Sequence, residues 1–122
     1  MSGACAIPED VVDYLAVDIG CVSPDTESEE HRVTITAQDT GAPYNGEFVK
    51  ELADLAEAKG IPFVLDVLVP HYGSDAEMAM RAGFDARHGL IGPGVLETHG
   101  YERTHRDALI NTTRLLCAIV EG

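Results

Sequence analysis

The sequence predicts an α/β protein built as a layered α/β/α sheet, and two observations lead to this prediction. Segments with the two-residue apolar period of strands alternate along the chain with segments that have the longer period of helices. The 122 residues are 45% apolar, which is enough to bury the core of one domain. Because neither a linker nor an internal repeat divides the chain, we expect residues 1–122 to form a single domain.

The first part of the chain predicts two strands joined by a surface loop. Residues 14–20, YLAVDIG, are rich in β-forming residues and predict a buried strand that ends at Gly20. Residues 23–31 are polar and carry four carboxylates, a composition typical of a surface connection. Residues 32–39, RVTITAQD, alternate apolar residues with threonine, as a strand with one solvent-facing side does.

The middle of the chain predicts a helix followed by a fully covered strand. Residues 47–60 form a helix that Gly60 ends, with an apolar stripe along one side. The stripe consists of Phe48, Leu52, Leu55 and Ala56. Residues 61–70, IPFVLDVLVP, are almost continuously apolar and predict a strand buried on both faces. Asp66 interrupts this run, so we expect it to form a hydrogen bond at a strand end or to lie at an edge.

The last part of the chain predicts a helix, a strand and a closing helix. Residues 73–84 predict a helix with its cap at Ser74 or Asp75. Residues 86–92, ARHGLIG, predict a short strand followed by a Gly-Pro-Gly turn. Residues 105–122 predict the closing helix. Its expected inner face consists of Leu109, Thr113, Leu116 and Val120.

Composition narrows the classes of function. The chain has 21 acidic residues against 8 Lys and Arg, a net charge of −13, whereas a nucleic-acid-binding protein needs a basic face. The acidic surface suits either ordinary solubility or a saline cytoplasm. No apolar run reaches the roughly 18 residues of a membrane span and no signal-peptide pattern is present, so we expect a cytoplasmic protein without membrane contact. Three cysteines without CxxC spacing predict small apolar fillers.

Two residues that follow predicted strands have the chemistry of metal ligands. Asp18 lies near the end of the first strand, and His105 follows the strand 86–92 and a loop. Ligands of open α/β sheets bind beyond the carboxyl ends of strands, so these two side chains could meet. Carboxylate oxygen and imidazole nitrogen are common ligands of Zn²⁺ and Co²⁺. Two alternatives stay open: Asp18 could bond to a neighbouring backbone amide, and His105 could cap the last helix.

Five stretches cover nearly the whole chain and are specific when taken together. In order they are GACAIPEDV, AVDIGCVSPD, HYGSDA, AGFDARHGLIGPG and HGYERTH. With these stretches the chain resembles the C-terminal half of the catalytic domain of the M42 family of metallo-aminopeptidases. The resemblance implies part of a zinc-peptidase-like domain that removes N-terminal residues from peptides. It also implies a co-catalytic pair of Zn²⁺ or Co²⁺ ions and association into a homo-oligomer.

The resemblance implies two metal ligands in this chain, one aspartate and one histidine. The family's terminal aspartate ligand matches Asp18 of AVDIG, and its last histidine ligand matches His105 of ERTH. In such sites the aspartate serves one metal ion and the histidine serves the other. We therefore expect this chain to supply one protein ligand to each ion.

Four further residues are candidates for supporting or substrate contacts: Asp75, His71, Tyr72 and Arg103. The family match suggests this role for Asp75, whereas His71 and Tyr72 lie at a strand end, where ligands collect, and Arg103 lies in the loop before His105. Their chemistry alone predicts simpler roles. Asp75 is expected to cap its helix, and His71 and Tyr72 are expected in a turn at a strand end. Arg103 is expected to pair with Glu102 in the loop that positions the last histidine.

The resemblance is incomplete where catalysis needs it most. The family's other metal-binding histidine, its bridging aspartate and a Glu-Glu pair that includes the general base all precede the matched region. Glu29 and Glu30 lie in a predicted loop and are expected to be a solvated pair, so we assign no catalytic residue. A catalytic zinc needs about three protein ligands. We expect the chain alone to be inactive, either as a component of an aminopeptidase that lacks its N-terminal half or as a non-catalytic α/β module for assembly or metal binding.

Overall fold

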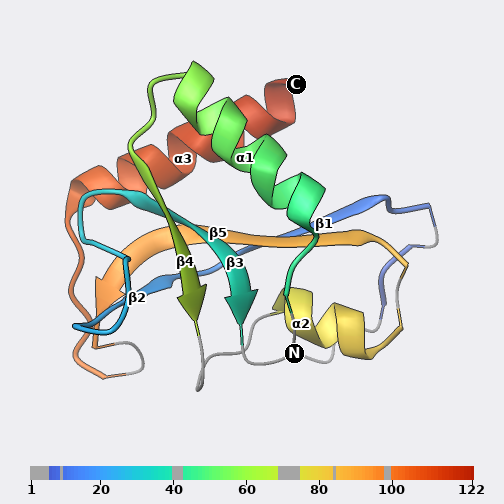
Figure 1. Ribbon diagram of the computed structural model, residues 1–122, viewed down its shortest axis with the longest axis horizontal. Helices are drawn as coiled ribbons and strands as arrows, with labels where there is room; N and C mark the ends of the chain where they lie inside the picture. Colours follow the sequence, from blue (N-terminus) through green and yellow to red (C-terminus); the bar gives the residue numbers. More distant parts are fainter. Residues whose placement is uncertain (1–5, 9, 40–42, 69–74, 84, 98–99) are drawn as a thin grey trace.

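A computed structural model describes residues 6–8, 10–39, 43–68, 75–83, 85–97 and 100–122 (Figure 1). The helices and strands alternate as the sequence predicts. In chain order they are β1 (Asp13–Val17), β2 (Gly20–Val22), β3 (Val33–Asp39), α1 (Gly46–Ala58), β4 (Phe63–Leu68), α2 (Asp75–Arg81), β5 (Arg87–Leu96) and α3 (Arg106–Glu121).

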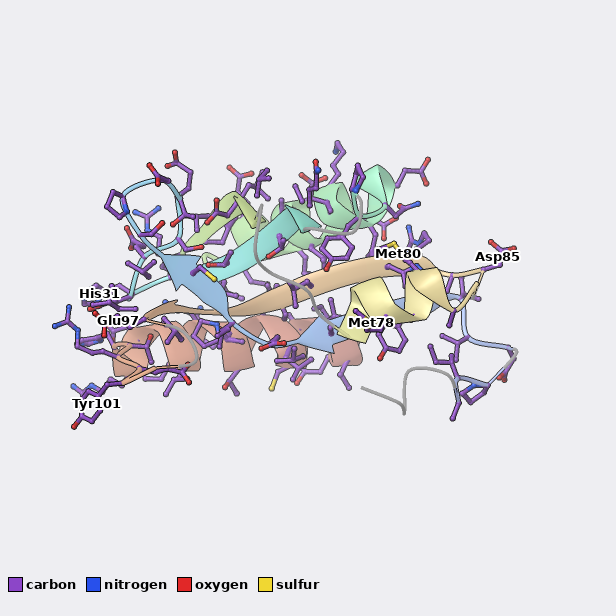
Figure 2. The ribbon with its side chains drawn as sticks, turned by 90° about the horizontal axis from the view of Figure 1, so that it is seen from below. His31, Met78, Met80, Asp85, Glu97 and Tyr101 are labelled. Carbon is purple, nitrogen blue, oxygen red and sulfur yellow. The ribbon has the colours of Figure 1, made fainter. Side chains whose placement is uncertain are left out.

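The predicted α/β/α layering is confirmed. α1 and α3 lie together on one face of the sheet, and α2 lies on the opposite face (Figure 1). Seen from below, α2 crosses the near face of the sheet with Met78 and Met80, while His31, Glu97 and Tyr101 gather at the far end from Asp85 (Figure 2). No helix within the described residues has the length and apolarity needed to cross a bilayer.

The sheet is mixed, with β5 at its centre. The strand order is β1-β5-β3-β4, and the short β2 pairs with β5 beyond the end of β1. β5 runs parallel to β1 and β2 but antiparallel to β3, whereas β3 and β4 are parallel to each other. The carboxyl ends of β1, β2 and β5 therefore share one end of the sheet, and those of β3 and β4 share the other.

The core forms between the sheet and the helices as the α1 stripe predicts. Phe48, Leu52 and Ala56 of α1 are buried against β3 and β5 together with Leu115 of α3. The helix begins where the Asn45 side chain accepts a hydrogen bond from the Phe48 N–H at 2.9 Å. It ends before Gly60, whose φ of 65° is the left-handed conformation that glycine adopts without strain.

The first predicted strand is interrupted, which the sequence did not suggest. β1 ends at Val17, and Gly20, expected to end the strand, begins β2 instead. Pro93 of β5 faces this break and has no N–H to donate to a neighbouring strand. β1 is also not buried along its length, because Val17 is 51% exposed.

The central strand, β5, is longer than predicted. It includes the segment that was expected to form a turn. β5 continues to Leu96, so the segment Gly92–Pro93–Gly94 is buried strand rather than a turn. A side chain at Gly92 would collide with the Asp18 carbonyl, and one at Gly94 would collide with the Glu29 carbonyl. The two glycines therefore permit close approach of neighbouring backbone segments.

The burial of β3 and β4 reverses two predictions. Thr34 and Thr36 of β3 were expected to face solvent, but both are buried. β4 was expected to be covered on both faces, but it is the last strand of the described sheet, and Leu65 and Val67 are nearly half exposed. Asp66, on the opposite side of β4, is 5% exposed. Its expected position at an edge is confirmed.

The face of α3 that packs inward also differs from the prediction. Ala108, Asn111, Thr112 and Leu115 are buried, whereas Leu109 and Val120 of the expected inner face are 50% and 79% exposed. Periodicity alone predicts that the more apolar stripe of α3 faces inward. In the structure, hydrogen bonds fix the rotation of the helix about its axis. The Asn111 side-chain amide donates to the His31 carbonyl at 2.8 Å. Cys117 is exposed as well, so it is not the apolar filler that was expected.

The buried Asp66 carboxylate joins β4 to the loop that precedes β3. It accepts hydrogen bonds from the backbone N–H of Ser28 at 2.9 Å and from the Ser28 hydroxyl, to which Thr34 in turn donates. We predict that Asp66→Ala lowers the free energy of unfolding by about 2–4 kcal/mol, because it leaves buried donors without a partner. Urea denaturation measures the loss. Asp54→Ala, which breaks an exposed ion pair with Lys50, is the matched control and should cost below about 0.5 kcal/mol.

The buried His88 ring predicts a pH dependence of stability. Burial lowers the pKa of His88, with a hydrogen bond to the Ala86 backbone acting in the opposite direction, and Nε2 has no hydrogen-bond partner among the described residues. The unfolded chain therefore binds a proton more readily than the folded chain, and stability falls as the pH drops below about 6.5. We predict that His88→Phe, which keeps a ring beside Tyr14, loses less stability than the wild type between pH 7.5 and 5 in urea titrations. An equal loss in both proteins would contradict this assignment.

Candidate metal site

Asp18 lies at the break between β1 and β2. Its backbone N–H donates to the Ile91 carbonyl at 2.9 Å, which holds the residue against β5. Its side chain is exposed, and no ion pair or hydrogen bond of its carboxylate is found among the described residues. Within the part of the chain that the structure describes, the alternative in which the Asp18 carboxylate bonds to a neighbouring amide is not found. The carboxylate is available to a ligand.

His105 is the N-cap of α3, as the alternative prediction states. Its Nδ1 accepts a hydrogen bond from the Asp107 N–H at 3.1 Å. The backbone N–H of His105 donates to the Glu30 carbonyl at 3.2 Å. The hydroxyl of the preceding residue, Thr104, donates to the Gly94 carbonyl of β5 at 2.6 Å. The ring is 42% exposed, so capping fixes its position without burying it.

The loop before His105 is held to the strand that precedes it. Leu96 and Arg103 exchange two backbone hydrogen bonds, of 2.7 and 3.1 Å, which close the loop 97–102. Arg103 was expected to pair with Glu102, but its guanidinium binds Glu30 at 2.9 Å instead. Arg103 thus ties this loop to the loop before β3, and Glu30 is paired rather than merely solvated.

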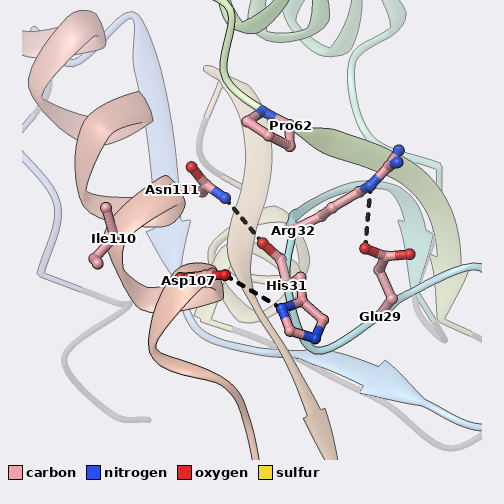
Figure 3. Close-up of a pocket in the computed structure, with 7 residues that line it drawn as sticks. All are labelled: Glu29, His31, Arg32, Pro62, Asp107, Ile110 and Asn111. Atoms are coloured by element: carbon pink, nitrogen blue, oxygen red, sulfur yellow. Dashed lines mark hydrogen bonds and ion pairs between the residues drawn. The ribbon is translucent and has the colours of Figure 1, made fainter.

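The imidazole of His105 has two neighbours that could share a metal ion with it. The His31 and His105 rings lie with their centroids 4.2 Å apart, and Asp107 lies beside both. Its Oδ2 atom is 3.3 Å from Nδ1 of His31 and 3.3 Å from Nδ1 of His105. Figure 3 shows His31 and Asp107 facing each other at the side of a hollow of about 340 Å³. Among the described residues, these three form the one group of potential ligand atoms that all lie within 4.8 Å of each other.

The two predicted ligands follow strands that point to the same end of the sheet. Asp18 packs against Gly92, and Thr104, just before His105, is bound to Gly94, two residues further along β5. Asp18 is not part of the close group around His105. The approach of Asp18 to His105 therefore stays a prediction. The two donor atoms suit a divalent metal, and no group of three potential ligands among the described residues includes Asp18.

The other predicted site residues have mixed outcomes. Asp75 begins α2, but its side chain lies outside the described residues, and so do His71 and Tyr72. Their expected contacts with metal or substrate stay predictions. Sequence reasoning gave no role to His31 or Asp107. They are 76 positions apart, so no local spacing links them, although an acidic residue two positions after a capping histidine is visible in the sequence.

The fold is a layered α/β domain with two polar residues, Asp18 and His105, after strands that point to the same end of its sheet. Comparison with known proteins identifies the family of the chain. Residues 1–115 match the family described as M42 glutamyl aminopeptidase, so the chain belongs to this family. It is 42% identical over 120 residues to YhfE, a candidate aminopeptidase of Bacillus subtilis (strain 168). The match covers 98% of this chain but 34% of YhfE, so the chain spans about a third of that relative.

Solved structures of aminopeptidases share the fold. The TET1 peptidase of Pyrococcus horikoshii, which can assemble into a tetrahedron or a large octahedral shell, superposes with a TM-score of 0.81 at 22% identity. The match covers 97% of this chain and 36% of that one. Aminopeptidase APDkam598 of the archaeon Desulfurococcus kamchatkensis superposes with a TM-score of 0.76 at 21% identity, over 98% of this chain and 36% of the other. The predicted fold and family are confirmed.

Proposed function

We propose that this chain is a component of a metal-dependent aminopeptidase that removes N-terminal residues from peptides. The observation that carries the proposal is the match of residues 1–115 to the M42 family, with Asp18 and His105 exposed beside the carboxyl half of β5. In the complete centre, Asp18 would hold one metal ion and His105 the other. Zn²⁺ or Co²⁺ bound there would supply Lewis acidity toward the scissile carbonyl and the attacking water. Within this chain, β5 and the cap of α3 hold the two ligands in place.

Exposed apolar side chains support contact with further protein. Leu65 and Val67 are exposed on the last strand of the described sheet, which still has a free edge there. Leu109 and Ile110 are about half exposed and Val120 is 79% exposed on the outer side of α3. For a protein of net charge −13, these groups mark surfaces suited to an N-terminal portion of the catalytic domain or to another copy of the chain.

A reconstitution experiment tests the proposal. The purified chain alone, with Zn²⁺ or Co²⁺, is expected not to hydrolyse aminoacyl chromogenic substrates, because two ligands do not hold a metal pair and the general base is supplied elsewhere. Addition of the N-terminal part of an M42 catalytic domain, which carries the remaining ligands and the Glu-Glu pair, is expected to restore turnover. Metal-dependent hydrolysis by the chain alone would show that the site is placed wrongly.

A non-catalytic role is the second candidate, and one observation favours it. His105 already caps α3 through Nδ1, so a structural role accounts for this residue without a metal. Such a module keeps the fold for assembly. Failure to restore turnover when both parts are folded and bound to each other would favour this role.

A further inference from the structure

We propose that His31, His105 and Asp107 form a binding site for one divalent transition-metal ion on the surface of this chain, formed in the chain alone by one residue of the proposed aminopeptidase centre and two residues outside it. The site goes beyond the proposed function, with which it shares only His105. Two imidazoles and one carboxylate are a ligand set that suits Zn²⁺, Co²⁺ and Ni²⁺. The three residues come from two parts of the chain, the loop before β3 and the first turn of α3.

The distances fit a metal site that needs little movement of the ligand atoms, apart from release of the Asp107 N–H from Nδ1 of His105. In a tetrahedral site with metal–ligand bonds of about 2.1 Å, neighbouring ligand atoms lie about 3.4 Å apart. The Oδ2 atom of Asp107 is 3.3 Å from Nδ1 of each histidine, and potential ligand atoms of all three residues lie within 4.8 Å of each other. One ion can therefore contact all three side chains, with its remaining coordination positions open to water.

Nδ1 of His105 lies beside the Asp107 carboxylate, and a cation between these two atoms would be favourable. Its Nδ1 accepts a hydrogen bond from the Asp107 N–H at 3.1 Å, which directs the ring nitrogen toward the first turn of α3. The same atom lies 3.3 Å from the Asp107 carboxylate, which only accepts. Two acceptors facing each other are unfavourable unless a positive charge lies between them. A bound ion would take the place of the Asp107 N–H as the partner of Nδ1.

The backbones of both histidines are fixed before any metal binds. The Asn111 amide of α3 donates to the His31 carbonyl at 2.8 Å (Figure 3). The backbone N–H of His105 donates to the Glu30 carbonyl at 3.2 Å. The two segments are thus joined on both sides of the ligand group. Two of the arginines nearby are neutralised by carboxylates, because Arg32 is paired with Glu29 and Arg103 with Glu30, whereas the exposed Arg106 has no ion pair among the described residues. A protein of net charge −13 also attracts cations to its surface.

Metal titration of the whole 122-residue chain tests the site. Calorimetry with Zn²⁺, and absorption spectroscopy with Co²⁺, are expected to give one ion per chain, with no binding of Mg²⁺, which prefers oxygen ligands. His31→Ala and Asp107→Asn are each expected to weaken binding at least about tenfold, since the loss of a supporting contact alone costs a metal site 10–100-fold. Glu27→Ala, a change at an exposed acidic residue of the same loop, is the matched control and should leave the affinity unchanged.

Asp18→Ala separates this site from the aminopeptidase centre. Binding to the chain alone should persist in Asp18→Ala and weaken in His31→Ala, and Zn²⁺ should shift the NMR signal of the Asp107 amide as it loses its bond to His105. Weak binding in Asp18→Ala with unchanged binding in His31→Ala would overturn the proposal and place the ion at the aminopeptidase ligands. Absence of Zn²⁺ binding to the folded chain would overturn it as well, while leaving the reconstitution test of the proposed function unaffected.

Discussion

Asp18→Ala and His105→Ala are each expected to abolish turnover in the enzyme reconstituted from this chain and an N-terminal part. Each ion of the proposed metal pair receives one protein ligand from this chain. Loss of a contact that only supports a ligand weakens metal binding about 10–100-fold, so loss of the ligand itself costs more. Loss of the ion also removes the activated water, so we expect kcat/KM to fall at least about 10³-fold.

The measurement is hydrolysis of an aminoacyl chromogenic substrate over a range of Zn²⁺ or Co²⁺ concentrations. Circular dichroism and binding to the N-terminal part show whether each variant still folds and assembles. Asp25→Ala, at an exposed aspartate in the loop after β2, is the control and should retain turnover. Full activity of Asp18→Ala in the assembled enzyme would remove this residue from the metal pair.

Local periodicity predicted the elements well where one interaction dominates. The α1 stripe packs as expected because its apolar residues gather on one side of the helix, with Phe48, Leu52 and Ala56 buried there. The Gly60 stop also agrees, since a left-handed residue is a local requirement. Features of this kind depend on the chemistry of a few neighbouring residues, so they can be read from the sequence.

The predictions of burial fail where contacts between distant parts of the chain determine which side chains are buried. The expected face of α3 is more apolar than the real one, but Asn111 bonds to His31 from the other side and sets the rotation of the helix. Thr34 appears polar in sequence, yet it joins the buried hydrogen bonds around Asp66. Pattern alone could not place these partners, because Asp66 and Ser28 are 38 positions apart.

In the candidate site too, the sequence predicts local features but not contacts between distant residues. Asp18 and His105 were selected by family resemblance together with their positions after strands. The position of His105 at the cap of α3 was foreseen as an alternative, since histidine can accept a backbone hydrogen bond. The approach of His31 to Asp107 depends on how α3 packs beside the loop before β3, and the sequence carries no pattern for that contact.

Gly92→Ala is expected to destabilise this fold strongly, because the added methyl group would collide with backbone atoms. A β-carbon at this position would lie 2.1 Å from the Asp18 carbonyl oxygen and 2.7 Å from the Ile19 nitrogen. These are backbone atoms, and the Asp18 N–H is bound to Ile91 next door, so neither strand can move without breaking hydrogen bonds. We predict a loss of about 3–5 kcal/mol in the free energy of unfolding, measured by urea denaturation.

Gly46→Ala is the matched control for this prediction. Gly46 is the first residue of α1, and a β-carbon there would meet nothing within 4 Å. Alanine also favours a helix over glycine, so stability should stay unchanged or rise by up to about 1 kcal/mol. Because the Gly92 contact falls on the Asp18 backbone, Gly92→Ala should also displace the proposed metal ligand, and a folded Gly92→Ala chain should then restore less turnover than Gly46→Ala in the reconstituted enzyme. A Gly92→Ala chain as stable and as active as the wild type would show that β1 and β5 are not in such close contact at Asp18.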